Sequence, residues 1–537
     1  MRRIGRMTVG APRGRFAEGG EALQYVLGVD IGSSGMKLSF LGQDGSMLGP
    51  YGVELKTGFP APGWAEQDPD DWYRALCSLL PRSLREAGLH GGDITAVAVD
   101  AATHTTVLLD ADMRPVRDAI MWNDQRSAAV AEECAAAWGD EIYRRTYHAP
   151  SAMWSLCQML WVRRQEPERW RRVRKLLFAK DYLRWRMGGR YVTDVIDAQG
   201  SMLLDMATMA WDPFLCGLAG LEPAWLPEIL QPCDPAGAVS ARCAEETGLP
   251  AGIPLYAGSS DTVMELLAVG AIHRGDATIK LATSGRICLI TDRAWPDPLL
   301  VNYRHVVPGL WYPGTGTRSC ATSLRWFKDC FCGADARAAA AAGESIYDVL
   351  DREAASVPAG AEGLLFHPYL LGEFTPYQDP NLRGSFTGIS MKHTRAHFVR
   401  ALMEGCAFSL LDCRGALERM GLAMPERFSI IGGGAAGTVW RQIVADGFQC
   451  VLSRPAYSDS SRGSAILAAV ACGMFRDFEE AVSVCENPAT EVLPRPAYGA
   501  FYRELFALYR EVHDRLAELY PRLTALRPPA EAPTLHN

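Results

Sequence analysis

The sequence predicts an α/β protein built from two similar domains with a cleft between them. Two observations support this prediction. A strand, a tight turn and a second strand occur near the N-terminus and again about 250 residues later, where the turn at residues 31–35 (IGSSG) is echoed by residues 281–285 (LATSG). Residues 427–473 then alternate strand-like and helix-like segments, as α/β folds do. A chain of 537 residues, 48% of them hydrophobic, is also too long for a single core.

The first copy of the repeated unit is expected to begin with three antiparallel strands within residues 25–55. A helix should follow, because Asp68 is a good N-cap and Pro69 suits the first helical position. The nearly all-apolar residues 93–101 predict a strand that is buried on both faces.

The second copy is expected to start with a strand, a tight turn and a strand over residues 277–291. Residues 301–307 and 309–316 are predicted to add further strands, and residues 319–327 to open a helix. The alternation in residues 427–473 predicts strand, helix, strand and helix in that order.

The first turn has the composition of a phosphate site. Gly32 and Gly35 permit tight backbone angles and close approach, so several N–H groups can face one concavity that binds an anion. Ser33 and Ser34 add hydroxyl donors, and Lys37 adds a positive charge. A Walker A sequence is absent, which favours a hairpin-type nucleotide site over a P-loop.

Asp30, directly before this turn, cannot bind a phosphate itself, because like charges repel. It can hold Mg²⁺ beside the phosphates, directly or through water. The alternative is an ordinary glycine hairpin in which the aspartate caps a turn. The echo at residues 283–285 favours the phosphate interpretation, since two facing turns can hold a polyphosphate from both domains.

A glycine run near the C-terminus leaves a second interpretation open. Gly432, Gly434 and Gly437 match G-x-G-x-x-G between a strand and a helix, as in dinucleotide-binding folds. That motif requires an acid at the end of the next strand, but residues 450–453 are followed by Arg454. Close approach of the backbone to an adenosine accounts better for these glycines.

Asp261 is the candidate general base. It follows a strand and a glycine-serine turn and precedes a helix, with Thr262 beside it. Phosphoryl transfer to a hydroxyl needs aligned groups, Mg²⁺ and a carboxylate that accepts the hydroxyl proton. The alternative is a plain helix N-cap, a position that aspartate often fills.

Composition excludes several classes of protein. The net charge of −8 argues against a nucleic-acid partner, despite the basic run at residues 169–175. No run of 18 apolar residues occurs, so a membrane partner is not expected. Fifteen scattered cysteines suggest reduced thiols in a cytoplasmic protein. Residues 1–24 are arginine-rich without the apolar core of a secretory signal, which predicts a disordered extension, and residues 526–537 a tail.

Taken together, several segments of the chain, in their order and spacing, resemble the FGGY carbohydrate kinases, most of all the xylulokinase branch of that family. The resemblance spans roughly residues 25–515. It rests on DIGSSGMK (30–37), WAEQDPDDW (64–72), MWNDQR (121–126), LWVRRQEPE (160–168), KDYLRWRMGG (180–189), SDTVMELLAVG (260–270), LATSG (281–285), PYLLGEFTP (368–376) and IIGGGA (430–435).

The resemblance implies two ribonuclease-H-like domains of the actin–hexokinase–Hsp70 type, expected at residues 25–270 and 271–525, with an interdomain cleft where ATP and sugar meet. It implies transfer of the γ-phosphate of ATP to a sugar hydroxyl with the aid of Mg²⁺. Since family members often form dimers, a homodimer is a further expectation. The alternatives are a kinase of another sugar or polyol of the family and a non-catalytic ATPase of the actin or Hsp70 type.

The family pattern also implies roles for single residues. Asp261 resembles the catalytic base and Asp30 the magnesium-linked acid. Phosphate contacts are implied for Ser33, Ser34 and Thr283, and an adenosine loop for Gly432 and Gly433. The sugar side is implied to include Thr103, His104, Trp122, Asp124, Asp261 and Thr262. Without the family pattern, His104 would more often be a structural histidine and Trp122 a core residue.

Two sugar-side positions depart from the xylulokinase pattern. Thr103 stands where those enzymes usually have methionine, and Thr262 where they usually have asparagine. Such changes alter both the shape and the hydrogen-bond partners of a polar pocket. The predicted substrate is therefore a pentulose or a related ketose or polyol rather than xylulose in particular.

Overall fold

The computed structural model describes residues 23–526, which form two compact units. Unit 1 contains residues 23–274, Ile290–Tyr312 and Tyr457–Pro488, and unit 2 contains Gly275–Leu289, Pro313–Ala456 and residues 489–526. Each unit is therefore assembled from segments that are far apart in the sequence. The expected N-terminal extension and C-terminal tail lie outside the described residues, apart from residues 23, 24 and 526. Leu23 is buried in the core of unit 1.

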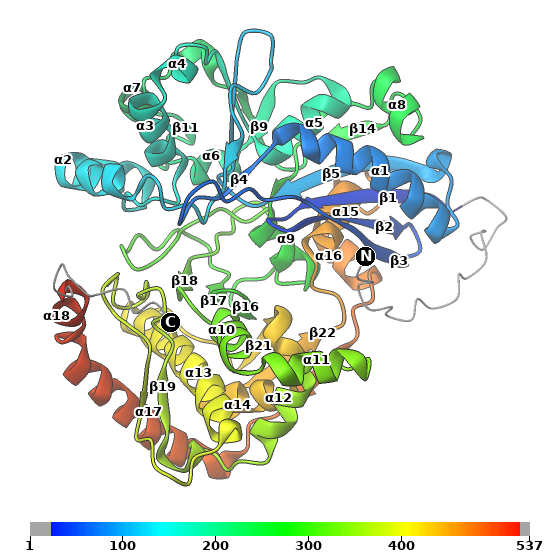
Figure 1. The fold of residues 1–537 in the computed structure, drawn as a ribbon. Coiled ribbons are helices and arrows are strands. Elements are labelled where there is room, and N and C mark those ends of the chain that lie inside the picture. Colours follow the sequence, from blue (N-terminus) through cyan, green and yellow to red (C-terminus); the bar gives the residue numbers. More distant parts are fainter. Residues whose placement is uncertain (1–22, 527–537) are drawn as a thin grey trace, which may run out of the picture. The chain divides into compact units, whose positions relative to one another are not determined.

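The central sheet of unit 1 contains, in spatial order, β13 (Pro235–Ala238), β14 (Pro254–Tyr256), β5 (Ile94–Ala101), β1 (Tyr25–Ile31), β2 (Gly35–Gly42) and β3 (Met47–Glu54) (Figure 1). The strands β1, β2 and β3 are antiparallel neighbours, which confirms the predicted start of the unit. On its other side β1 pairs in parallel with β5, and β5 with β14. Every residue of β5 except Thr95 is buried, as its apolar sequence predicts.

Alternate side chains of β1 serve the two faces of this sheet. Val29 and the other odd-numbered residues pack in a core cluster with α1 (Pro69–Ala87), the helix predicted after Asp68. Gly28 faces the opposite side, where an added Cβ atom would lie 1.9 Å from the carbonyl oxygen of Ser461 in α15 (Ser460–Ala471). The close approach of α15 to β1 therefore requires a glycine.

Unit 1 also carries smaller sheets and the helices that surround them. A four-stranded sheet has the order β4 (Glu66–Gln67), β7 (Ala119–Ile120), β6 (Thr106–Leu109) and β8 (Lys175–Phe178). Two-stranded sheets are formed by β10 (Leu204–Asp205) with β11 (Ala210–Trp211) and by β9 (Val192–Asp194) with β12 (Glu228–Leu230), whereas β15 (Ser259–Ser260) pairs with β5 in the central sheet. The other helices are α2 (Ala128–Thr146), α3 (Ser155–Gln165), α4 (Pro167–Trp170), α5 (Ala179–Gly188), α6 (Val195–Gly200), α7 (Pro213–Ala219), α8 (Ala241–Thr247), α9 (Asp261–Ala268) and α16 (Phe478–Val484).

The central sheet of unit 2 contains β18 (Gly314–Gly316), β17 (Gly285–Leu289), β16 (Ala277–Leu281), β21 (Arg427–Ile431), β22 (Val451–Pro455) and β23 (Ala489–Val492). Its helices are α10 (Ala321–Phe331), α11 (Gly333–Ala341), α12 (Ile346–Ala355), α13 (Arg395–Arg419), α14 (Thr438–Phe448), α17 (Pro496–Ala517) and α18 (Tyr520–Ala525), and β19 (Leu365–His367) pairs with β20 (Ser385–Thr387).

The two central sheets repeat one plan. From β3 to β13 in unit 1, neighbouring strands run antiparallel, antiparallel, parallel, parallel and antiparallel. From β18 to β23 in unit 2, the directions follow the same series. The predicted duplication of an α/β unit is confirmed.

The prediction of a strand at residues 301–307 is wrong. Within this stretch only Val301 and Arg304 form isolated bridges, that of Arg304 with Trp311. Side chains take the backbone donors that a strand would use, because the Asn302 N–H donates to His148 Nε2 (3.1 Å) and the Arg304 N–H donates to Gln199 Oε1 (3.0 Å). The stretch also belongs to unit 1, although its neighbours in the sequence belong to unit 2.

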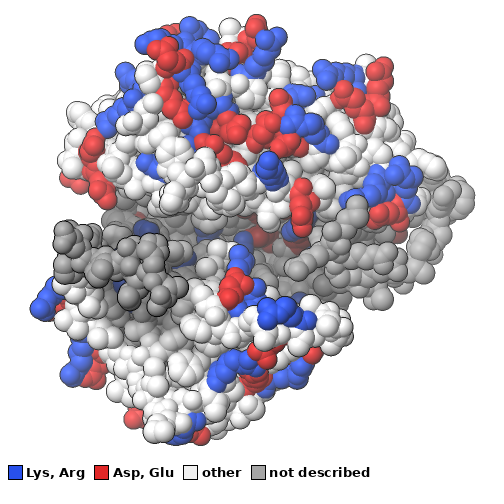
Figure 2. Space-filling view, in the orientation of Figure 1, with Lys and Arg blue, Asp and Glu red and all other residues white. Residues whose placement is uncertain are grey.

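The basic run at residues 169–175 is largely balanced by neighbouring acids. Arg169 pairs with Glu166, Arg171 with Glu168 and Arg172 with Asp110. On the face drawn in Figure 2, blue and red side chains are likewise interspersed. Among residues 23–526, no helix has the length and apolar character needed to cross a membrane.

Candidate active site

The first turn lies at the end of two adjacent strands of unit 1, and each strand supplies an aspartate. Asp30 near the end of β1 is directly opposite Asp100 of β5 and opposite Lys37 of β2. Asp30 is 5% exposed and Asp100 is fully buried. Asp100 accepts a hydrogen bond from the Ser464 hydroxyl (2.6 Å), so α15, which packs against the central sheet, also contacts this pair of aspartates.

Asp30 interacts with three further carboxylates, those of Asp100, Asp261 and Asp459, and with one ammonium group, that of Lys37. Burial and the nearby carboxylate of Asp459 raise the pKa of Asp30 to about 7, and Asp261 acts in the same direction. Burial and Asp30 raise the pKa of Asp100 well above its ordinary value. Lys37 donates to Asp459 and lies 3.9 Å from Asp30. Burial lowers the pKa of Lys37, but Asp459 and Asp30 together raise it above the ordinary value.

The donor set fits Mg²⁺ only as a shared site. Within residues 23–526, no three His, Cys, Asp or Glu side chains converge closely enough to hold a metal ion by themselves. Mg²⁺ usually keeps several waters and uses one or two carboxylates plus substrate phosphates. Asp30, whose neighbours leave an excess of negative charge, suits that role beside a nucleotide.

Asp261 is held through only one of its oxygens. Its Oδ1 accepts hydrogen bonds from the Thr262 N–H (2.7 Å), from the Thr262 hydroxyl (3.3 Å) and from the Thr103 hydroxyl (3.4 Å). No described residue donates to Oδ2. Asp261 is half-buried and is the first residue of α9, whereas Ser260 takes the N-cap position, so the N-cap alternative is wrong.

The first turn also contacts the predicted sugar side. The indole N–H of Trp122 donates to the Ser33 hydroxyl (3.1 Å), and the Ser33 carbonyl accepts from Thr57 and Gln67 side chains. The side chains of Ser33 and Ser34 lie at an exposed position of unit 1. The structure therefore brings Trp122 and the Ser33 hydroxyl together.

His104 sits in an aromatic cluster rather than on an open surface. It is 4% exposed and has a φ of 71°, and its ring packs edge-on against Trp154 at 4.7 Å. Its Nε2 lies 3.2 Å from the Tyr303 hydroxyl, and an added Cβ at Gly200 would lie 2.3 Å from its Nδ1. Tyr303 was not singled out by sequence, because its segment gave only a strand-like pattern.

Asp124 is fully committed within unit 1. It is completely buried, and Oδ1 accepts from the Arg126 N–H and Nε while Oδ2 accepts from the Ala65 N–H (2.6 Å) and Arg126. Arg126 in turn stacks on the ring of Trp64 at 3.9 Å. These four bonds fix the loop that presents Trp122.

In unit 2 the second turn is packed against the glycine run. Gly432 has a φ of +88°, and an added Cβ would lie 2.5 Å from the carbonyl oxygen of Leu281. Thr283 is exposed, and its carbonyl accepts from the N–H of Cys320 at the start of α10 (3.0 Å). The Thr317 hydroxyl accepts from the Gly285 N–H (2.9 Å). Thr283, Gly432 and Gly433 thus belong to one loop cluster.

Two of the carboxylates around the first turn, those of Asp100 and Asp459, are not among the site residues predicted from the sequence. The sequence predicts Asp100 only as part of a buried strand and predicts no role for Asp459. Both carry a recognisable signal, since Asp100 ends a strand that pairs with β1 and Asp459 precedes Ser460 as the N-cap of α15.

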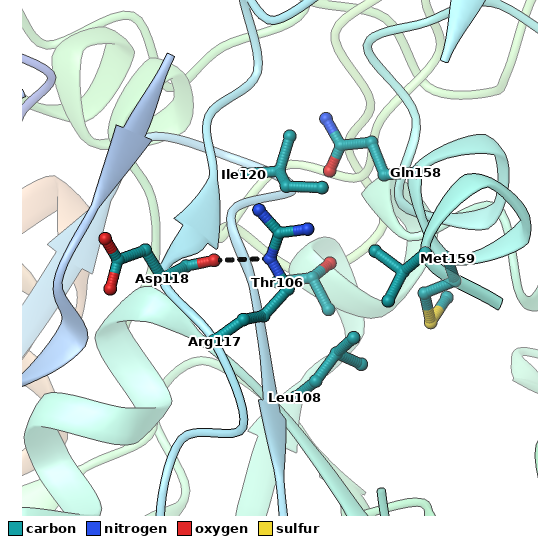
Figure 3. A pocket seen from close by; sticks show the side chains of 8 residues that line it. Thr106, Leu108, Arg117, Asp118, Ile120, Gln158 and Met159 are labelled. Atoms are coloured by element: carbon teal, nitrogen blue, oxygen red, sulfur yellow. Dashed lines mark hydrogen bonds between the residues drawn. The ribbon is translucent and has the colours of Figure 1, made fainter. Parts of the chain in front are cut away.

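A small cavity in unit 1 is not the substrate site. It lies between β6 and α3, and Figure 3 shows Arg117 and Gln158 in its wall. Its volume of about 10 Å³ admits one water molecule. Gln158 Oε1 is buried without a hydrogen-bond partner among the described residues, which such a water would satisfy.

Comparison with known protein families shows to which family the chain belongs. Residues 25–268 match the N-terminal domain of the FGGY family of carbohydrate kinases, and residues 283–472 match its C-terminal domain. This chain is an FGGY carbohydrate kinase. The glycine run lies inside the C-terminal FGGY domain, so the dinucleotide-binding alternative is wrong.

Individual FGGY kinases are similar over nearly their whole length. A xylulose kinase of Lactococcus lactis is 31% identical, with 90% of this chain and 96% of that protein covered. A gluconokinase of Bacillus licheniformis is 29% identical, with 90% and 94% covered. The solved structure of a ligand-bound xylulose kinase from Lactobacillus acidophilus has a TM-score of 0.84 at 25% identity and covers 93% of this chain and all of that chain.

Proposed function

We propose that this FGGY kinase transfers the γ-phosphate of ATP to a hydroxyl of a pentulose or a related ketose or polyol, with Asp261 as the general base. The observation that carries the proposal is the asymmetry of the Asp261 carboxylate. Thr262 and Thr103 hold Oδ1, while Oδ2 accepts no bond from a described residue. An oriented carboxylate with one available oxygen is what deprotonation of a hydroxyl requires.

The reaction then follows in one displacement. Asp261 Oδ2 takes the proton of the sugar hydroxyl, the hydroxyl oxygen forms a bond to the γ-phosphorus, and the bond from that phosphorus to the bridging oxygen breaks to release ADP. Mg²⁺ held near Asp30 would neutralise charge on the phosphate oxygens. Phosphate contacts are proposed for Ser33, Ser34 and Lys37, and nucleotide contacts for Thr283, Gly432 and Gly433.

The sugar-side residues divide into two groups. Trp122, Thr103 and Thr262 are proposed to contact the sugar, because each lies beside the turn or beside Asp261. His104 is proposed to do so from its aromatic cluster. Asp124 acts on the sugar through the loop that it fixes, since both of its oxygens are already engaged.

The decisive experiment measures the activity of the enzyme on a panel of candidate substrates. ADP release would be measured with D-xylulose, other ketopentoses, pentitols, glycerol and gluconate, with wild type and Asp261→Asn in parallel. We expect at least one ketose or polyol to raise ADP release far above the sugar-free rate, and Asp261→Asn to abolish that increase. Slow ATP hydrolysis that no compound changes would contradict a kinase function and favour the ATPase alternative.

Gluconate belongs in the panel for a specific reason. A gluconokinase is 29% identical to this chain, and Thr103 and Thr262 depart from the xylulokinase pattern at the sugar side. Preferred turnover of gluconate would place the substrate among sugar acids and would leave the role of Asp261 intact.

Two broader expectations accompany this function. Action in the cytoplasm is supported by fifteen cysteines without a disulfide between them. A homodimer stays a prediction, which light scattering coupled to size-exclusion chromatography would test.

A further inference from the structure

A fully buried ion-pair cluster lies in unit 1 beneath the segment that carries Asp261. Lys180 of α5 has no exposed surface, and its ammonium group contacts Asp181 (2.5 Å), Asp194 (2.9 Å) and Asp197 (3.0 Å). Asp194 is also the N-cap of α6 and accepts a hydrogen bond from the Ile196 N–H (2.9 Å). Burying such charges is costly unless their geometry is well matched, so the cluster holds α5 and α6 in one arrangement.

The cluster reaches the catalytic segment at two points. The Ser259 hydroxyl, two residues before Asp261, donates to Asp194 Oδ2 (3.1 Å). Arg184, which donates to Asp181 Oδ1 (3.0 Å), also donates to the carbonyl oxygen of Ala257 (2.6 Å). The ion pairs are therefore connected to residues 257–259 by two hydrogen bonds. One joins the side chains of Ser259 and Asp194, and the other joins the Arg184 side chain to the backbone carbonyl of Ala257.

The same segment is fixed from its other side by the central sheet. β15 pairs in parallel with the end of β5, at Asp100 and Ala101. Gly258 has a φ of +71°, and an added Cβ would lie 2.0 Å from the carbonyl oxygen of Val99. Residues 257–260 therefore lie between β5 and the buried cluster, and the chain enters α9 directly afterwards.

We propose that Lys180 and Asp194 are positioning residues for Asp261, acting through Ser259. A general base must be within hydrogen-bond reach of the proton that it takes, and a misplacement of about 1 Å can cost roughly 10²-fold in rate. The cluster restricts the strand that leads into Asp261, and so restricts where Oδ2 can lie. This inference rests on the proposed role of Asp261.

Ser259→Ala tests the connection without leaving a charge unpaired, because Asp194 keeps its bonds to Lys180 and to the N-terminus of α6. We expect kcat to fall about tenfold, with KM for sugar and ATP changed less than twofold. The matched control is Ser83→Ala, which removes another fully buried hydroxyl, one that donates to the Leu79 carbonyl inside α1 (2.9 Å). The control should keep kcat within twofold of wild type. Equal kcat values for Ser259→Ala and the control would overturn the inference.

Amide hydrogen exchange gives a second readout that does not depend on turnover. Ser259→Ala should speed exchange of residues 257–263 relative to wild type and to Ser83→Ala. If wild type phosphorylated no compound of the panel, the proposed function would fall, yet faster exchange in this segment would still support the restraint. Unchanged exchange would overturn the inference whatever the activity.

Discussion

The turn at residues 31–35 in unit 1 and the turn at residues 281–285 in unit 2 join equivalent strands of two sheets with the same order and directions. Asp30 precedes the first turn at the position that Lys280 takes before the second. Opposite them in the hairpins stand Lys37 and Arg286. One turn therefore begins with a carboxylate and the other with an ammonium group.

The residues around the two turns also differ in charge, with more carboxylates around the first turn. Around the first turn stand three further carboxylates, those of Asp100, Asp261 and Asp459. Around the second turn stand the glycine run and the Thr317 hydroxyl. On the proposed function, the copy in unit 1 would carry the general base and the cation site and the copy in unit 2 a phosphate-binding loop, so the chemistry would depend on side chains rather than on the shared fold.

Asp261 is the proposed general base beside the first turn, and its loss should have the largest effect. Asp261→Asn keeps the shape and the hydrogen bonds to Oδ1 but removes the proton acceptor. We expect kcat to fall about 10²–10⁴-fold, while calorimetry shows ATP binding within threefold of wild type. Asp112→Asn, at an exposed position of the same unit, is the control and should leave kcat unchanged. Retained turnover in Asp261→Asn would refute the assignment of the base.

Removing the charge that precedes each turn should separate the roles of the two turns. Asp30→Asn is expected to lower kcat about 10–100-fold, the range for losing one charge-assisted contact, and to raise the Mg²⁺ concentration needed for half-maximal rate. Lys280→Met removes the positive charge beside the second turn, which would attract the phosphates of ATP, so it is expected to raise KM for ATP about fivefold and to leave the Mg²⁺ requirement unchanged. Titrations of Mg²⁺ and ATP against initial rate measure both. The same altered parameter in both variants would remove the distinction between the turns.

The sequence was sufficient for the features that depend on local pattern. The strand-turn-strand unit, its repetition and the helix after Asp68 follow from apolar spacing and turn residues, which are local properties. The first turn and Asp261 could be found because glycines, hydroxyls and an acid stand close together in sequence. The placement of Thr103 beside Asp261 rests on β5 and α9, which are more than 150 residues apart.

Features that depend on contacts between residues far apart in the sequence could not be predicted from local sequence patterns. Asp459 meets Lys37 only because α15, from the far end of the chain, packs on β1. The stretch at residues 301–307 has a strand-like composition, but His148 and Gln199 take its backbone donors. Tertiary contacts of this kind override β-propensity.

The glycines that close the two turns should differ in their tolerance of alanine. At Gly35 an added Cβ would lie 2.7 Å from the backbone carbonyl oxygen of Val53, which is fixed in the sheet. At Gly285 the nearest atoms belong to the side chains of Leu410 (2.9 Å) and Thr317 (3.0 Å), which can move. We expect Gly35→Ala to lower the free energy of unfolding by about 1–3 kcal/mol and Gly285→Ala by less than half as much. Urea denaturation followed by fluorescence measures both, and the reverse order would contradict this account.

The smallest expected difference is in pH dependence of the metal-free protein. Burial and Asp459 raise the pKa of Asp30 to about 7 from an ordinary value of 3.8. Between these values the folded protein holds a proton that the unfolded chain has released, so this group makes stability fall as pH rises through the window and level off above pH 7. Thermal unfolding in EDTA should give a melting temperature a few degrees lower at pH 7.5 than at pH 5.

Asp30→Asn removes this contribution and should flatten the profile, although Asp100, whose pKa is raised by burial and by Asp30, contributes in the same direction. Lys280→Met, at the equivalent position before the second turn, removes no carboxylate and should keep the wild-type slope. A wild-type slope in Asp30→Asn would mean that the negative charge gathered at the first turn does not oppose folding. The contrast between the turns would then reduce to their contacts with substrates.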